Sequence, residues 1–207
     1  MSLDRLIIEF DKGLRTLLAK PASARANPAA DIDEAELTDA EKKQITALMR
    51  VNHTGEVCAQ ALYSGQAITS KNTETTDALN VASREEIDHL AWCDARITEL
   101  NGRASLLNPL FYASSFALGA VAGAIGDQWN LGFLAETEKQ VSTHLNKHLD
   151  ALPPQDLKTR AIVTQMQVDE NQHAEMAKHY GAAELPEVVQ KIMQATSKVM
   201  TTASYYL

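Results

Sequence analysis

The sequence predicts an all-α protein with a four-helix bundle at its centre, and three observations support this. Apolar residues recur at helical spacing in several long segments, and no segment shows a competing strand pattern. Two Glu-x-x-His pairs occur, Glu86-Ile-Asp-His89 and Glu170-Asn-Gln-His173. A single glutamate precedes each pair, Glu56 by 30 residues and Glu138 by 32, which fits one bundle helix, a turn and part of an antiparallel partner.

These side chains form a candidate ligand set. Residues i and i+3 of a helix lie on one face, so both side chains of a Glu-x-x-His pair can reach one metal ion. The single glutamates would bridge or cap the ions from the facing helices. Carboxylate oxygen combined with imidazole nitrogen suits iron or manganese, whereas four carboxylates without metal would repel one another. The sequence therefore predicts a di-iron or di-manganese site with the ligands Glu56, Glu86, His89, Glu138, Glu170 and His173.

The N-terminal region precedes the bundle. Apolar residues between Leu3 and Leu18 fall near one face of an amphipathic helix, which would pack on the body or contact a surface or partner. Residues from Pro21 to Asp33 are rich in Ala and Pro and have no period, so they are expected to be a linker. We therefore divide the chain into an N-terminal region, 1–37, and a bundle domain, 38–207.

Five further helices are expected, at residues 38–70, 74–100, 127–152, 155–180 and about 187–201. Thr38-Asp-Ala-Glu41 is a capping-box pattern that starts the first of them. Asn101-Gly102 and Gly181 end the second and fourth, and Pro153-Pro154 stops the third. The last is a short C-terminal helix.

An uncharged segment, 104–126, lies between the second and third of these helices. It is just long enough to span a bilayer, but Asn108-Pro109 interrupts its start. A spanning segment would also place the two halves of the metal site on opposite sides of the membrane. Two interpretations remain: a buried bundle element, or an apolar surface that contacts lipid or a lipophilic ligand. Gly119 and Gly123 would permit close helix approach.

Composition limits the other function classes. The net charge of −8 argues against nucleic acid as the main partner. Cys58 and Cys93 form no C-x-x-C motif, which indicates a reducing compartment and packing roles for both.

Several residues near the ligands are secondary candidates. Asp88 and Asp169 adjoin ligands in sequence, off the ligand face, where they could orient histidines of other helices. The helical phase of Glu85 does not match the ligand pairs. Tyr63 is interpreted as a core tyrosine, with cavity lining as the alternative. His144 follows Glu138 by six residues, so direct ligation is awkward and a role beside the ligands or the substrate is left open.

A combined motif extends over residues 38 to 180. It comprises Arg50-Val-Asn-His-Thr-Gly-Glu56, Tyr63-Ser-Gly-Gln66, Glu86-Ile-Asp-His89, Ala135-Glu-Thr-Glu138, His144 and Asp169-Glu-Asn-Gln-His173. Together these stretches resemble the demethoxyubiquinone hydroxylase family of ubiquinone biosynthesis.

The resemblance implies a ferritin-like bundle and an O2-dependent di-iron monooxygenase that hydroxylates the ring of a prenylated methoxy-methyl-benzoquinol. It implies two iron ions per chain, held by the six predicted ligands, with His144 near the site. It also implies a peripheral enzyme on the cytoplasmic face of the inner membrane, whose uncharged segment meets membrane and prenyl tail.

Alternatives from other classes are ferritin-like iron storage, another di-metal oxidoreductase, and a metal-free helical module. The sequence leaves open the prenyl length, the electron donor, homo-oligomer formation, a lipid-presenting partner and the role of residues 1–37.

Overall fold

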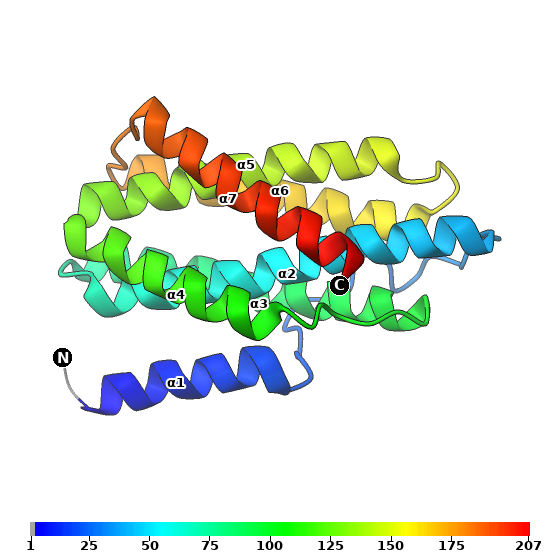
Figure 1. Ribbon diagram of the computed structural model, residues 1–207, viewed down its shortest axis with the longest axis horizontal. Coiled ribbons are helices and arrows are strands. Elements are labelled where there is room, and N and C mark those ends of the chain that lie inside the picture. The colour runs from blue at the N-terminus through cyan, green and yellow to red at the C-terminus, as the bar shows by residue number, and fades with distance from the viewer. Residues whose placement is uncertain (1–2) are drawn as a thin grey trace.

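Helices make up most of the molecule. A computed structural model describes residues 3–207, and within that range it contains helices and no strand, which confirms the all-α prediction (Figure 1). Except at the end of the C-terminal helix, the predicted helix boundaries agree with the observed ones to within a few residues. The helices are α1 (Leu3–Leu18), α2 (Asp39–Thr69), α3 (Thr73–Glu99), α4 (Asn108–Ile125), α5 (Asp127–Ala151), α6 (Leu157–His179) and α7 (Glu187–Tyr206).

Local sequence explains where the helices begin and turn. The capping box at the start of α2 forms as expected, because the Thr38 hydroxyl accepts from the Glu41 backbone N–H while the Glu41 carboxylate accepts from the Thr38 N–H. Asn72 and Asp156 cap α3 and α6 through their side chains alone, which accept from the backbone N–H groups of Glu74 and Thr159. Gly126 joins α4 to α5 at a φ of 140°, a conformation that favours glycine.

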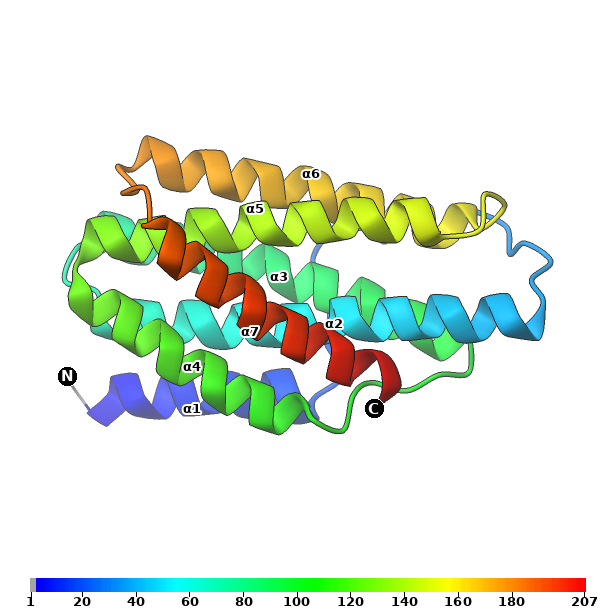
Figure 2. The ribbon, with the colours of Figure 1, turned by 45° about the horizontal axis from the view of Figure 1, so that its top comes forward.

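The bundle consists of α2, α3, α5 and α6, which lie side by side (Figure 2). The pairs α2–α3 and α5–α6 are antiparallel hairpins. Helix α4 connects the two hairpins and runs back along the length of the bundle, packed on α2. As a result, α3 and α5 point the same way (Figure 2). One crossover of this kind is the connection found in ferritin-like bundles, in agreement with the predicted fold.

Two apolar clusters fill the bundle, one toward each end. The first includes Met49, Trp92, Leu145 and Met166. The second includes Leu62, Leu79, Leu134 and Ala177. Each bundle helix contributes to both clusters, so the middle of each helix is left for polar side chains. Cys93 belongs to the first cluster, which confirms its packing role.

Helix α4 packs closely on α2 through glycines. A Cβ atom at Gly119 would overlap the Leu62 carbonyl, and one at Gly65 would overlap the Phe116 carbonyl. The opposite face of α4 is exposed, with Leu110 64% and Val121 61% accessible. One face of the uncharged segment therefore packs against the bundle and the other is an exposed apolar surface, whose contact with lipid or a lipophilic ligand stays a prediction.

The C-terminal helix is longer than expected. Helix α7 continues past Thr201 to Tyr206 and lies across α2 and α5 (Figure 1). The side chain of Arg50 on α2 donates to the carbonyl oxygens of Tyr205 (3.0 Å) and Arg103 (2.9 Å), which fixes the end of α7. This long-range contact is absent from the local pattern used to predict the helix end.

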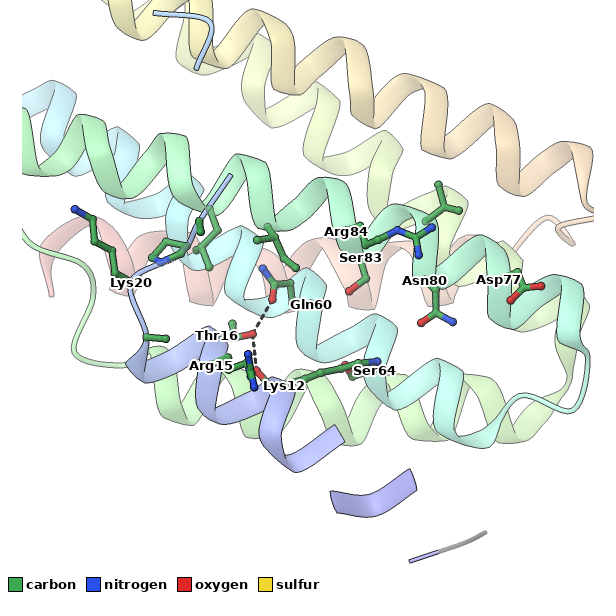
Figure 3. A pocket seen from close by; sticks show the side chains of 16 residues that line it. Lys12, Arg15, Thr16, Lys20, Gln60, Ser64, Asp77, Asn80, Ser83 and Arg84 are labelled. Atoms are coloured by element: carbon green, nitrogen blue, oxygen red, sulfur yellow. Dashed lines mark hydrogen bonds between the residues drawn. The ribbon is translucent and has the colours of Figure 1, made fainter. Parts of the chain in front are cut away.

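The N-terminal region contacts the bundle at several points. Helix α1 packs beside α2 and α4, where the Tyr112 ring lies against Gly13. A groove of about 610 Å³ separates α1 from α3, with Thr16 and Gln60 hydrogen-bonded across its floor (Figure 3). The segment from 19 to 38 is irregular, as predicted for a linker, but it is held against the bundle.

Close packing of α2 against α4 gives a stability prediction. The substitution Gly119→Ala should lower the free energy of unfolding by about 1–3 kcal/mol, because the helices must separate. The matched control is Gly55→Ala in α2, where an added Cβ meets nothing within 4 Å. This variant should be about 0.5–1 kcal/mol more stable than wild type, because alanine is favoured over glycine inside a helix. Urea unfolding of both variants measures the difference. Equal stabilities would show that the helix contact is looser than described.

Candidate metal centre

The six predicted ligands come together in the middle of the bundle, between the two apolar clusters. Helices α2 and α5 each contribute one glutamate, and α3 and α6 each contribute a Glu-x-x-His pair. All six residues are at most 3% exposed, and they are Glu56, Glu86, His89, Glu138, Glu170 and His173.

The ligand atoms form two overlapping groups. Within each group, the ligand atoms all lie within 4.8 Å of one another. One group contains Glu56 and His89, the other contains Glu138 and His173, and both contain Glu86 and Glu170. The single glutamates therefore cap the two groups, whereas the paired glutamates occupy the shared, bridging position. This arrangement could hold two metal ions side by side.

The donor set fits such ions. Four carboxylates supply hard oxygen donors, and Nδ1 of each histidine faces the carboxylates, at 3.1 Å from Glu86 for His89 and 3.3 Å from Glu170 for His173. Oε1 of Glu86 is buried and makes no well-aligned hydrogen bond among the described residues, although Nδ1 of His173 lies 3.4 Å away. A bound cation would satisfy that oxygen.

A carboxylate outside the ligand set holds the other ring nitrogen of each histidine. Nε2 of His89 lies 2.8 Å from Asp169, which confirms that Asp169 can orient a histidine on another helix. Nε2 of His173 lies 2.7 Å from Glu85, a contact that the phase argument missed. Asp169 and Glu85 each directly precede the glutamate of a Glu-x-x-His pair, so the internal repeat could have identified Glu85. These contacts leave Nδ1 free to bind metal.

Two further expectations have outcomes here. Tyr63 is buried, as predicted for a core tyrosine, and its hydroxyl donates to the Glu138 carboxylate. His144 lies outside both ligand groups, and its ring packs against His148 with 4.0 Å between the centroids. The structure therefore shows no contact between His144 and the ligands, and its predicted role stays a prediction.

Burial and crowding shift the protonation of the centre. Burial, with the charges of Glu86 and Glu170, raises the pKa of Glu56 well above its usual range, and burial beside Glu170 does the same for Glu138. Burial disfavours the imidazolium of His89, but bonds to Asp169, Glu170 and Glu86 raise its pKa. For Glu86, hydrogen bonds from Glu56 and both histidines outweigh burial and lower its pKa. The metal-free centre thus retains protons that the metal-bound ligands would release.

An apolar groove of about 340 Å³ lies on the other side of α2 and α5. Helices α2, α4, α5 and α7 line it, and Leu62, Phe111, Phe133 and Met193 are among its side chains. Gly55 and Thr137, which also line the groove, directly precede the ligands Glu56 and Glu138. The groove therefore lies against the two helix segments that carry the capping glutamates.

The shifted pKa values predict how stability depends on pH. Glu56, Glu138 and His89 have raised folded-state pKa values, so the stability that they contribute falls as pH rises from the ordinary pKa of each group toward its raised value. The pKa of Glu86 is lowered, so the stability that Glu86 contributes is lost as pH falls below the ordinary range of a glutamate. Melting temperature of the metal-free chain should fall between about pH 6 and about pH 8, and stabilisation by added Co(II) should grow. A metal-free melting temperature that rises over this range would contradict the assignment.

Comparison with known proteins agrees with the geometry of the centre. A family described as "Ubiquinone biosynthesis protein COQ7" matches residues 43–204. Relatives named 3-demethoxyubiquinol 3-hydroxylase include one from Chromobacterium violaceum, 61% identical over 98% of both chains. Those from Nitrosospira multiformis and Nitrosomonas europaea are 58% and 55% identical, over 100% of this chain and 99% and 100% of theirs. The chain therefore belongs to the family of the ubiquinone biosynthesis protein COQ7.

Proposed function

We propose that this chain is a 3-demethoxyubiquinol 3-hydroxylase that uses two iron ions and O2. The observation that carries the proposal is the pair of buried ligand groups that share Glu86 and Glu170. The names of full-length relatives at 52–61% identity supply the reaction and the substrate, a benzoquinol of ubiquinone biosynthesis. Iron storage, the alternative on the same fold, has no comparable support.

The residues of the centre have distinct tasks in this proposal. Two bound iron ions would supply the chemistry that activates O2 for the hydroxylation. Glu86 and Glu170 would bridge the ions, while Glu56 and Glu138 cap them. Each histidine is fixed by an outer carboxylate, so its ligand nitrogen needs little reorganisation when metal binds. The apolar clusters on both sides keep water from the ligands.

The apolar groove supports a substrate with a prenyl chain. Its walls are hydrophobic side chains of four helices, and burying apolar chain surface there would contribute about 25 cal/mol per Å². The groove lies beside the capping glutamates, so a chain held in it would keep the quinol ring close to the centre. Apolar walls with few polar groups are typical of sites for lipophilic ligands.

A peripheral position on the cytoplasmic face of the inner membrane is also part of the proposal. Exposed apolar side chains lie on α1 and on the neighbouring α4, where Phe10 is 69% and Ile125 63% accessible. Lys12, Arg15 and Lys20 line the groove beside α1, so cationic groups flank its apolar face (Figure 3). This combination is typical of helices that lie in the headgroup region.

Helix α4 is long and apolar enough to cross a membrane by length and composition alone. Two observations favour a surface position instead. Gly119 and Gly123 pack against α2, and the helices that α4 connects, α3 and α5, both supply ligands to one centre. A crossing α4 would separate α3 from α5.

Removing one bridging glutamate tests the function. Glu170→Ala should lower the rate of hydroxylation of a demethoxyubiquinol more than about 100-fold and should lose most iron binding. The effect should be this large because residues that only hydrogen-bond a metal ligand already contribute about 10- to 100-fold. The matched control is Glu175→Ala, an exposed residue of the same helix that pairs with Lys178 and should behave as wild type. Iron analysis after anaerobic loading should give about two ions per wild-type chain. Retained activity in Glu170→Ala, or uptake of many irons per chain, would refute the proposal.

Charged substitutions test the membrane surface. Phe10→Glu on α1 and Val121→Glu on α4 should each reduce binding to phospholipid vesicles by about tenfold or more, because burying one such side chain contributes about 1.5–3 kcal/mol. Val168→Glu is the control, since this residue is 44% exposed on α6, on the far side of the bundle (Figure 2). Sedimentation with vesicles measures the bound fraction. Unchanged binding of the first two variants would remove this surface from the proposal.

A further inference from the structure

The segment between α1 and α2 is fixed at two points along the bundle. Near its end, the Glu34 carboxylate accepts from both terminal nitrogens of Arg96, at 2.6 and 2.9 Å. Near its start, Arg25 reaches toward the candidate metal centre. We call residues 23–25 the strap, because this short stretch makes contacts with α3 and α6 together.

Three groups of the strap hold Asp88 on α3. The Ala24 N–H donates to its Oδ1 at 2.6 Å, the Ser23 hydroxyl to the same oxygen at 3.0 Å, and Arg25 Nε to its Oδ2 at 2.7 Å. The Arg25 guanidinium also lies over the Trp92 ring, 4.8 Å from its centroid. Asp88 therefore anchors the strap and sets where the Arg25 guanidinium lies.

The same guanidinium pairs with Asp169 on α6. Nη2 of Arg25 lies 2.8 Å from Oδ2 of Asp169, as an ion pair rather than a well-aligned hydrogen bond. That oxygen is also the one 2.8 Å from Nε2 of His89. Gln165 donates to the other oxygen of Asp169 at 2.9 Å. Arg25 therefore contacts the candidate ligand His89 indirectly, through Asp169. Both carboxylate oxygens of Asp169 are held in place by neighbouring side chains.

The other half of the centre has no such support. Nε2 of His173 contacts Glu85, whose side chain is 36% exposed and has no second hydrogen-bond or ion-pair partner within residues 3–207. The outer carboxylate of His89 is 5% exposed and is held by a cation from outside the bundle. The two halves therefore differ in how firmly the histidine ring is held.

We propose that Arg25 is a positioning residue, which holds Asp169 so that the His89 ring keeps Nδ1 toward Glu56, Glu86 and Glu170. This inference rests on the metal ligation proposed above. Its consequence is that the two metal positions are unequal, and that the ion beside His89 is bound more firmly than the ion beside His173. The strap, and with it the N-terminal region, is then part of the metal centre.

Anaerobic titration with Co(II), followed by its visible absorption, tests this inference. Arg25→Met keeps an aliphatic stem over Trp92 but removes the charge. It should lower the affinity for one of the two ions by about tenfold and leave the affinity for the other unchanged. A tenfold loss is about the low end of what residues that hydrogen-bond a metal ligand contribute. Arg25→Lys, which keeps a cation near Asp169, should restore part of the loss. Arg103→Ala is the matched control, an exposed arginine outside the centre.

A second variant identifies the ion. Glu85→Gln should lower the affinity for the ion beside His173. The double variant Arg25→Met/Glu85→Gln should therefore bind both ions less tightly. A double variant that still binds one ion as tightly as wild type would overturn the inference, as would a folded Arg25→Met chain with two unchanged affinities. Equal weakening of both ions by Arg25→Met, with a lower melting temperature, would show a merely structural role. Failure of the wild-type chain to bind two ions would instead refute the proposed function.

Discussion

The fold depends on burying four carboxylates and two imidazoles at one level of a helical bundle. Moving an ionised carboxylate out of water costs several kcal/mol unless an opposite charge or hydrogen bonds compensate. In the metal-free chain, burial and the neighbouring carboxylates raise the pKa values of Glu56 and Glu138, so these two groups retain protons that reduce the charge. Two divalent cations would replace those protons and balance the four negative charges. The charge of the buried carboxylates is thus offset by protons in one state and by cations in the other.

This constraint determines how the rest of the chain is arranged. Each bundle helix has an apolar stretch on both sides of its ligand, so the two apolar clusters enclose the polar layer. Helix α4 returns the chain to the end of the bundle where α2 turns into α3, which brings the second hairpin beside the first with its ligands at the same level (Figure 2). Glycines let α4 do this at close range against α2. The uncharged segment is thus required for the centre before any contact with lipid is considered.

The ligands and helices could be predicted from the sequence because their signals are local. Spacing of three residues within a turn, capping residues and apolar periodicity all depend on neighbours along the chain. The contacts that were missed join distant segments: Glu85 to His173, Tyr63 to Glu138, and Arg25 to Asp169. No helical period predicts them. The linker lacked a period and was correctly expected to be irregular, but absence of a period does not show whether a segment is free or held.

The internal repeat explains both what is symmetric in the centre and what is not. The residue before each Glu-x-x-His pair fixes the histidine of the other pair, so Asp169 and Glu85 are equivalent. Two features break the equivalence. Tyr63 donates to Glu138, whereas the equivalent position seven residues after Glu138 is the apolar Leu145. Of these two outer carboxylates, the strap contacts Asp169 and makes no hydrogen bond or ion pair with Glu85 among the described residues. Both asymmetries lie outside the ligand set, so a symmetric arrangement of six ligands can still offer two ions different environments.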